Sequence, residues 1–290
     1  MSAETMEGHA VMEEQSGKLW SGGKSPFKSS YGKLMMWYFL LSDAFTFAGF
    51  LIAYGTLRFS NATWPVPDFV FSSFPFLKGT HYPLLFVSLM TFILLASSFT
   101  MIRAVQEGKE ENKSGIVKWM IYTIIGGLMF LGCQAWEWNT LISTEHMTIS
   151  TNPFGTHLES GVYLDDEHGH AYAAAAERET FDAGDSYLIH RADEQWLKRR
   201  FELTSGPNTG QVSQQEFGPK AFGALFFCIT GFHGFHVFSG VVFLILIAVN
   251  VANGLYAKRR NGYEMVEKIG LYWHFVDLVW VFVFLVFYLL

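Results

Sequence analysis

Charged residues are scarce in this sequence: Asp, Glu, Lys and Arg together make up 16% of the 290 residues. Soluble domains usually carry about 25%. The balance is slightly acidic, with 26 acidic side chains against 20 basic ones. Such a chain lacks the basic surface on which nucleic-acid binding depends, so no nucleic-acid partner is expected. Hydrophobic residues make up half of the sequence, which favours a membrane protein.

Cysteine is almost absent. Cys133 and Cys228 each lie inside an apolar run, and we expect them to be packing residues in neither a disulfide nor a metal site. The first 33 residues are polar and contain no apolar stretch of signal-peptide length. No cleavable signal peptide is therefore predicted, and the first apolar run should stay in the mature chain.

Long apolar runs are abundant. Five of them have the length of about 20 residues that a helix needs to cross a bilayer, and lipid leaves helices and closed barrels as the only spanning structures. The 29 Phe and nine Trp residues also fit the aromatic belts of membrane proteins. The runs lie at about residues 34–57, 82–102, 119–142, 221–251 and 266–290.

These runs predict an all-α membrane protein, a bundle of five transmembrane helices with a long polar extramembrane insertion between the third and the fourth. The domains that we expect are a polar cytoplasmic tail at 1–33, helices one to three at 34–142, an acidic external insertion at 143–219, and helices four and five at 220–290.

Lysine and arginine predict the orientation of the bundle. They gather before the first run, between the second and third, and between the fourth and fifth, whereas Arg58 and Lys78 are the basic residues of the loop between the first and second. The positive-inside rule then places the N-terminus in the cytoplasm and the C-terminus and residues 143–219 outside. The residues that carry this bias are Lys18, Lys24, Lys28, Lys33, Arg103, Lys109, Lys113, Lys118, Lys258, Arg259, Arg260 and Lys268.

The insertion at 143–219 carries 13 acidic residues against five Arg or Lys. We expect a small lobe, because a structureless loop of that length is uncommon. Residues 171–179 are predicted to be helical, and 186–203 are open between helix and strand. The acidic surface has two interpretations: a solvated face, which charge runs usually are, or a docking face for a basic partner.

Two carboxylates lie inside apolar runs. Asp43 sits about nine residues into the first run, where a carboxylate must face protein or water, or be protonated. It is a candidate proton-exchanging group, and the alternative is a carboxyl paired with a nearby Ser, Tyr or His. Glu137 lies between Trp136 and Trp138. It is either an interfacial residue that reaches the headgroups or the partner of a histidine on the fourth run.

His233 and His236 are three residues apart among glycines, so they share one face of the fourth helix. Metal sites use this spacing, but a complete site needs further ligands. His274 could supply one nitrogen, and no Glu-x-x-His motif is present. We therefore favour histidines hydrogen-bonded to carboxylates or backbone over a metal site. Gly231, Gly234 and Gly240 should let neighbouring helices approach closely at this level.

The last run repeats the three-residue spacing with His274 and Asp277, which predicts a histidine–carboxylate pair on one face of the fifth helix. Trp273 and Trp280 lie on a neighbouring stripe and are interpreted as packing and lipid-contact residues. The polar framework that we predict is Glu137, His233, His236, His274 and Asp277, and the lipid or packing candidates are Trp136, Trp138, Trp273 and Trp280.

Four segments together resemble subunit III of the haem-copper oxidases, the cytochrome c and quinol oxidase family. They read TGFHGFHVFSG at 230–240, YWHFVDLVWVFVF at 272–284, LLSDAFTFAGFLIAY at 40–54 and LGCQAWEW at 131–138. The resemblance covers residues 34–142 and 218–290 and is to the five-helix bacterial type, since the two additional N-terminal helices of the longer members are missing. It says nothing about the 143–219 insertion. Asp43 stands where many members have Glu.

The resemblance implies a non-catalytic chain in the bacterial inner membrane. The haems and copper would lie in partner subunits I and II, and this chain would hold no cofactor or metal of its own. It would pack on subunit I, bind phospholipid and support proton uptake and turnover stability during oxygen reduction. If the acidic insertion is a docking face, its basic partner in such a complex would be cytochrome c or another respiratory complex.

Three alternatives stay open beside a cytochrome c oxidase. The chain could be subunit III of a quinol oxidase or an accessory subunit of a nitric oxide reductase. In a different class, it could be an autonomous membrane haem carrier, ligated by His233, His236 or His274.

Overall fold

The computed structural model describes residues 30–71, 83–173, 178–192, 195–257 and 262–290. The chain divides into two units, residues 1–39 and 40–290, and the described part of the first contains the beginning of helix α2. Most of the predicted tail at 1–33, and Lys78, Lys258, Arg259 and Arg260, lie outside the described residues.

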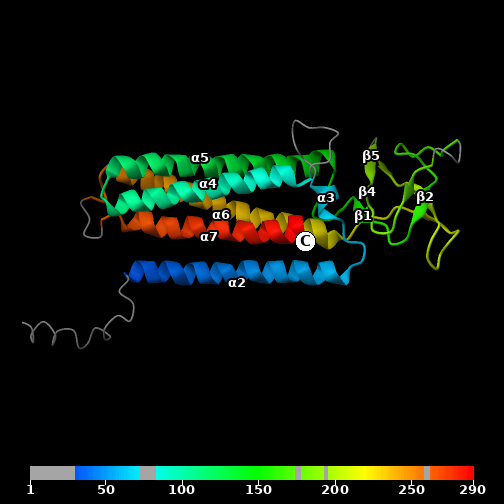
Figure 1. The fold of residues 1–290 in the computed structure, drawn as a ribbon, viewed down its shortest axis with the longest axis horizontal. Coiled ribbons are helices and arrows are strands. Elements are labelled where there is room, and N and C mark those ends of the chain that lie inside the picture. The colour runs from blue at the N-terminus through cyan, green and yellow to red at the C-terminus, as the bar shows by residue number, and fades with distance from the viewer. Residues whose placement is uncertain (1–29, 72–82, 174–177, 193–194, 258–261) are drawn as a thin grey trace, which may run out of the picture. The chain divides into compact units, whose positions relative to one another are not determined.

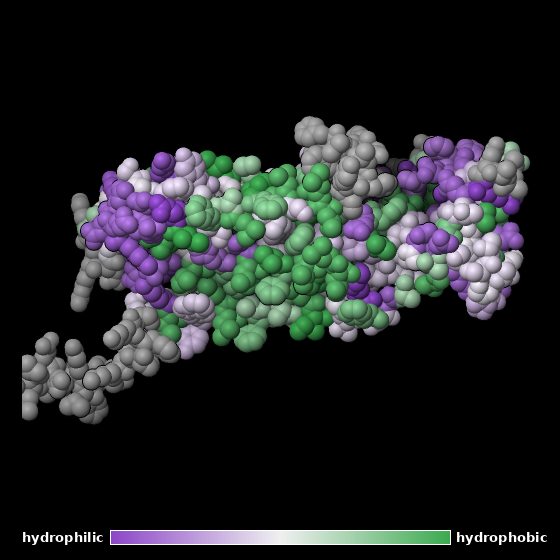
Figure 2. Space-filling model, in the orientation of Figure 1, coloured by the Kyte–Doolittle hydropathy of each residue, from purple (hydrophilic) through white to green (hydrophobic). Residues whose placement is uncertain are grey.

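In the described residues, five helices are long and apolar enough to cross a membrane, which is the number that the apolar runs predict, so the chain is a multi-pass membrane protein. They are α2 (Tyr31–Ser60), α4 (Pro83–Lys109), α5 (Lys113–Asn139), α6 (Lys220–Ala252) and α7 (Glu264–Phe284) (Figure 1). A π-helical turn continues α5 over Thr140–Thr144 and another continues α7 over Leu285–Leu289. On the face in Figure 2, hydrophobic residues cover the middle of the helices and hydrophilic residues gather at their ends.

The connection between α4 and α5 is shorter than the apolar runs predict. Helix α4 continues seven residues past the expected end at 102, and α5 begins six residues before the expected start at 119. Polar contacts explain the extension, since Arg103 pairs with Glu107 at 3.9 Å and the Asn112 side chain accepts a hydrogen bond from the backbone N–H of Gly115. Helices therefore extend beyond the apolar slab wherever polar side chains stabilise their ends.

Hydroxyl groups on α4 hold α7 in place. The indole N–H of Trp273 donates to Ser97 at 3.1 Å, and that of Trp280 donates to Thr91 at 3.1 Å. The same hydroxyls donate to carbonyls of their own helix. Each therefore bonds to its own helix and also to a neighbour, as expected for hydroxyls in apolar helices.

Glycines bring α5 and α6 close to Trp273. A Cβ atom on Gly127 would lie 2.6 Å from the Trp273 ring, and one on Gly240 would lie 3.1 Å from it. A Cβ on Gly231 would lie 3.0 Å from Trp138. The prediction for Gly234 is wrong, because nothing lies within 4 Å of a Cβ atom built at that position.

Replacing Gly127 with alanine is expected to destabilise the bundle by about 1–3 kcal/mol, because the added methyl group overlaps Trp273 and Val241. Gly132→Ala on the same helix is the matched control. Nothing lies within 4 Å of its Cβ position, so alanine should be neutral or stabilise the helix by up to about 1 kcal/mol. Unfolding of the purified chain in detergent micelles measures both, and equal shifts would contradict the close packing at Gly127.

Helix α2 contributes one narrow stripe to the packing. Its buried residues Leu40, Phe47 and Tyr54 recur every seven positions, which places them on one face of the helix. Phe47 packs against Phe232 of α6 at 5.1 Å between ring centroids. Large apolar side chains elsewhere on the helix stay exposed, such as Phe45 at 71%. Much of the surface of α2 is therefore free to meet lipid or another chain.

Residues 150–218, here called the β lobe, fold as short strands between α5 and α6 (Figure 1). A four-stranded antiparallel sheet has the order β3-β2-β7-β8, and two-stranded ladders pair β1 with β4 and β5 with β6. The strands are β1 (Phe154–Thr156), β2 (Gly161–Tyr163), β3 (Thr180–Phe181), β4 (Ser186–Leu188), β5 (His190–Ala192), β6 (Gln195–Leu197), β7 (Arg200–Leu203) and β8 (Val212–Gln214).

The helix predicted at 171–179 is wrong for the residues that the structure describes. Ala171 forms a β-bridge with Asp165, and the chain at 178–179 leads directly into β3; residues 174–177 lie outside the described part. The β-bridge to Asp165 has overridden the helix propensity of Ala171. The open segment 186–203 resolves into strands β4 to β7.

Hydrogen bonds tie the β lobe to the segment that follows α2, which contains the short helix α3 (Pro67–Val70). The Thr156 hydroxyl donates to the Trp64 carbonyl at 3.0 Å, and the Val66 N–H donates to the Ser186 hydroxyl at 3.0 Å. Next to α6, the Asn152 side chain donates to the Pro219 carbonyl at 3.1 Å. The β lobe is thus anchored at its β1–β4 ladder and beside the start of α6.

Candidate functional site

Asp43 meets His236 between helices α2 and α6. The carboxylate oxygen Oδ2 lies 3.2 Å from the imidazole Nε2. The other ring nitrogen, Nδ1, lies 2.8 Å from the Phe232 carbonyl and must donate to it, because a carbonyl only accepts. Nε2 and Oδ2 therefore share one proton in this bond, held either by the ring or by the carboxyl. The arrangement found is therefore the carboxyl paired with a histidine, which was the alternative interpretation of Asp43.

Tyr272 of α7 completes the surroundings of His236. Its hydroxyl donates to the His236 carbonyl at 3.2 Å and lies 2.9 Å from the Ser239 hydroxyl. Neither Tyr272 nor Ser239 was predicted to take part. The sequence feature that could have indicated a role for Tyr272 is its position directly before Trp273 and His274 in the last apolar run.

Glu137 lies in a second polar cluster, between α5 and the end of α7. It is 1% exposed, so it is not an interfacial residue that reaches the headgroups. The Tyr288 hydroxyl lies 2.9 Å from Oε2 and 3.1 Å from Oε1, and the Gln134 side chain donates to Oε2 at 3.0 Å. Tyrosine and glutamine therefore take the place of the histidine partner that was the other interpretation.

His274 and Asp277 are both directed to Ser98 on α4. The hydroxyl lies 2.7 Å from His274 Nδ1 and also interacts with the carboxyl of Asp277. The predicted histidine–carboxylate pair is thus joined through a hydroxyl on a neighbouring helix. Because the serine belongs to α4, this cluster fastens α4 to α7.

His233 occupies the centre of the bundle. It is fully buried and stacks on Trp280 at 5.3 Å between ring centroids. The rings of Phe130 and Phe47 meet it edge-on, at 5.8 and 6.4 Å. In the described part of the chain, neither of its nitrogens has a hydrogen-bond partner, so the bonded histidine that the sequence favours is found at His236 but not at His233. No group of three His, Cys, Asp or Glu side chains that could hold a metal ion is found in this part either.

The four candidate tryptophans divide into two groups. Trp136 is 48% exposed and available to lipid, and Trp138 packs against Phe227 at 5.3 Å. Trp273 and Trp280 are 1% and 0% exposed. The last two are therefore internal packing residues, and the lipid-contact interpretation does not apply to them. Both cysteines are free.

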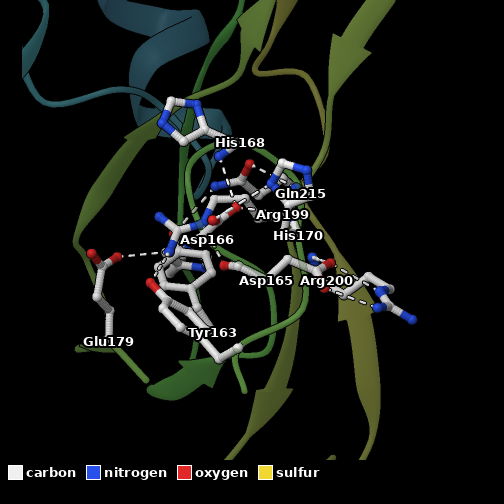
Figure 3. Close-up of polar contacts among 11 residues, drawn as sticks. Tyr163, Asp165, Asp166, His168, His170, Glu179, Arg199, Arg200 and Gln215 are labelled. Carbon is white, nitrogen blue, oxygen red and sulfur yellow. Dashed lines mark hydrogen bonds and ion pairs between the residues drawn. The ribbon is translucent and has the colours of Figure 1, made fainter. Parts of the chain in front are cut away.

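Arg199 organises the polar interior of the β lobe (Figure 3). Its guanidinium donates to the Glu179 carboxylate at 2.7 Å and to the Asp165 carbonyl at 2.9 Å, and it lies 3.8 Å over the ring of Tyr163. The neighbouring Arg200 forms a bidentate pair with the Asp165 side chain at 2.9 Å. Hydrogen bonds from Arg200 hold the pKa of Asp165 below its usual value. These contacts give the β lobe a polar interior that joins distant parts of its sequence.

His157 lies in the aromatic core of the β lobe. Its ring stacks on Phe181 at 3.7 Å, and Nε2 lies 2.6 Å from the Tyr163 hydroxyl. Loss of hydration on burial lowers the pKa of His157 to about 4, against the opposing effect of Asp185. Burial also raises the pKa of Tyr163 to about 12. The histidine is therefore neutral in the folded lobe at neutral pH.

Acidification is expected to destabilise the β lobe through His157. Its pKa is lower in the folded state than the value of 6.5 of an unperturbed histidine, so the unfolded state binds more protons between these values. Stability should be constant above pH 6.5, fall by about 1–3 kcal/mol as the pH drops towards 4, and lose nothing more from this group below that. Hydrogen exchange of residues 154–203 in the full chain measures this. His157→Phe should remove the step; a step that survives it would mean that another group titrates.

Comparison with known proteins agrees with the resemblance seen in the sequence. Residues 212–290 match the family model described as cytochrome c oxidase subunit III. A cytochrome c oxidase subunit 3 from Thermostichus vulcanus is 25% identical over 254 residues, which cover 87% of this chain and 84% of the relative. A quinol oxidase subunit 3 from Bacillus spizizenii is also 25% identical, over 93% of this chain and 94% of the relative.

Sequence identity is higher over a shorter alignment. A probable cytochrome c oxidase subunit 3 from Rickettsia bellii is 46% identical over 59 residues, 20% of this chain and 21% of the relative. Five apolar helices, the family match over α6 and α7, and relatives that align over most of their length agree with one another. Residues 212–290 of this chain thus match the cytochrome c oxidase subunit III family, and most of its length is similar to oxidase subunits 3 that are named for cytochrome c or for quinol.

Proposed function

We propose that this chain is the non-catalytic subunit III of a bacterial terminal oxidase, and that it supports proton uptake and turnover stability while partner subunits reduce oxygen. The observation that carries the proposal is the bond between Asp43 and His236. A carboxylate at this depth is costly unless it is paired or protonated, and here it shares a proton with an imidazole on another helix. Such a pair can exchange protons without a metal or a substrate beside it.

The surface of α2 supports a place beside subunit I. Asp43 lies on a span whose buried residues form a single stripe, and large apolar side chains are exposed elsewhere on that helix; examples are Phe45, Ile52 and Phe59, at 71%, 68% and 80% exposure. Subunit I, subunit II and phospholipids are the partners that would cover such surfaces. Trp136, exposed at 48% near one end of α5, is a residue for lipid contact.

The remaining polar residues have a structural role in this proposal. Glu137, His274 and Asp277 each bond to a residue of another helix, and they would keep the bundle in shape while haem and copper stay in the partner subunits. The chain would lie in the bacterial plasma membrane with its N-terminus in the cytoplasm. Its C-terminus and the β lobe would then lie in the periplasm.

Purification of the oxidase with and without this chain tests the proposal. The complex without it should take up protons more slowly and lose activity sooner under turnover. Asp43→Asn in the complete complex should slow proton uptake and leave the complex assembled, whereas Asp68→Asn, a carboxyl outside the spans, is the control and should behave as wild type. The supporting role is wrong if removal of the chain changes neither rate.

The electron donor is open, since the relatives are named for cytochrome c and for quinol. If a basic cytochrome is the donor, the acidic β lobe is a docking face. Deletion of 150–215 should then weaken binding of the donor and reduce the salt dependence of the affinity. The affinity of donor cytochrome, measured across a range of ionic strength, checks this. A salt dependence that the deletion leaves unchanged would contradict docking through the lobe.

A further inference from the structure

Four buried polar atoms without a partner gather where α5 faces α6. They are Oε1 of Gln134, Nε1 of Trp138 and both ring nitrogens of His233. The described residues contain seven such side-chain atoms in all, so more than half of them belong to these three residues. Gln134 and His233 are 6% and 0% exposed. Leaving a buried polar atom unpaired costs about 1–3 kcal/mol, so this concentration requires an explanation.

The antiparallel register of α5 and α6 places these residues at one level. Gly231 lies against Trp138, and Gly127 lies against Val241. Counting along the two helices from these contacts puts Gln134 opposite residues 234–235 of α6, within about one turn of His233. Phe130, one turn before Gln134 on the same face of α5, contacts the His233 ring directly at 5.8 Å. Gln134 and His233 therefore face the same interior space.

The hydrogen-bond donors and acceptors of Gln134, Trp138 and His233 match those of a bound water molecule. Gln134 Oε1 accepts, Trp138 Nε1 donates, and a neutral imidazole supplies one donor and one acceptor in either tautomer. Water both donates and accepts, and buried waters make about three hydrogen bonds to such groups. A metal cation does not fit, because an indole N–H and an amide that is already bonded to Glu137 offer it too few ligands.

We propose that α5 and α6 bind an internal water molecule between Gln134 and His233. The water accepts from or donates to one His233 nitrogen and donates to Gln134 Oε1, with the Trp138 indole as a further donor. Gln134 already bonds to Glu137, and Glu137 bonds to Tyr288. The water therefore joins His233 of α6 to the cluster between α5 and α7 in one hydrogen-bonded chain.

The hydrogen-bonded chain that includes this water ends at His233 and does not reach Asp43. The ring of Phe47 lies against both imidazoles, 6.4 Å from His233 and 5.5 Å from His236. An aromatic ring offers no path for a hydrogen-bonded proton relay. The water site and the proton-sharing pair are therefore separate, and the inference holds whether or not the proposed role of Asp43 is correct.

A double-mutant cycle on the full chain in micelles tests the site. Gln134→Leu and His233→Phe should each lower the midpoint of thermal unfolding by about 2–8 °C, because each leaves the bound water and its other partner unsatisfied. The double variant should lose clearly less than the sum of the two shifts, because it removes both sides of the site together. The matched cycle of Gln134→Leu with Asp43→Asn should be additive, since Phe47 separates those residues.

Two results of this cycle would overturn the proposal. One is additivity of Gln134→Leu and His233→Phe. The other is a higher midpoint for His233→Phe, which is the result expected if the nitrogens are truly unpaired. If a variant does not fold, an electron cryomicroscopy map of the assembled wild-type oxidase decides. A density peak at about 2.7–3.2 Å from both Gln134 Oε1 and a His233 nitrogen supports the site, and no peak, or a direct bond between the two side chains, refutes it.

Discussion

Arg199→Met is expected to lower the free energy of opening of the β lobe by about 2–4 kcal/mol, among the largest single effects in the chain. The guanidinium is buried and satisfies the Asp165 carbonyl, the Glu179 carboxylate and the Tyr172 hydroxyl together. Methionine has a similar length and fills the same space, but it donates to none of them. The loss should appear as faster amide hydrogen exchange in strands β2 and β7 of the full chain.

Arg191→Met is the matched control in the same lobe. That arginine is exposed and stacks on Trp196 at 5.7 Å, a contact worth about 0.5–1 kcal/mol at the surface. Exchange in β2 and β7 should therefore stay close to that of the wild type. If the two variants open the lobe equally, the effect comes from loss of positive charge in an acidic lobe and not from the buried contacts of Arg199.

Glu137→Leu is expected to destabilise the membrane bundle by about 2–4 kcal/mol. The carboxylate is fully enclosed and is the hydrogen-bond partner of Tyr288 and Gln134. Leucine would leave the phenol and the amide without that acceptor in an apolar interior. The end of α7 should loosen first, because Tyr288 lies in its final turn. Denaturant unfolding in mixed micelles gives the change in free energy.

Two conservative variants separate the effect of losing the hydrogen bonds of Glu137 from the effect of changing side-chain volume. Glu137→Gln keeps an acceptor for Tyr288 and should cost about 1 kcal/mol. Tyr288→Phe keeps the ring, which lies 4.3 Å from Phe71, and removes only the hydroxyl. It should cost less than Glu137→Leu, since it leaves Glu137 bonded to Gln134. If Glu137→Gln is as damaging as Glu137→Leu, a charge on Glu137 is required beyond its hydrogen bonds.

Much of the membrane part was predictable because lipid restricts the choices of the chain. A span of about 20 apolar residues must be helical, so the five helices follow from the apolar runs. The ends of α4 and α5 were not predictable from hydropathy, because side chains such as Arg103 and Asn112 extend helices beyond the apolar region.

The partners of the buried polar residues could be predicted only by class. A carboxylate for a histidine of α6 was expected, and Asp43 supplies it to His236. Tyr288 lies 151 positions from Glu137. In the sequence, nothing distinguishes it from the other aromatic residues of the last apolar run. Only the fold brings these two together, so spacing along the chain carries no signal for their bond.

The strands of the β lobe were even harder to predict from the sequence than the partners of the buried polar residues. They have two to four residues each, which is too short for an alternating pattern to be recognised. Strand β1 is buried at all three positions and β5 is exposed at all three. The lobe depends instead on contacts between distant residues, such as Arg199 with Glu179, that no local pattern indicates.

The cross-links between α4 and α7 restrict how this chain can move. Trp273, His274 and Trp280 bond to Ser97, Ser98 and Thr91, which cover almost two turns of α4. Sliding α7 by one helical turn, about 5.4 Å, would break all three bonds at once and drive Trp273 out of its place beside Gly127 and Gly240. Motions during turnover should therefore carry α4 and α7 as one rigid body, and α2, fastened along a single stripe, is the span that can shift against them.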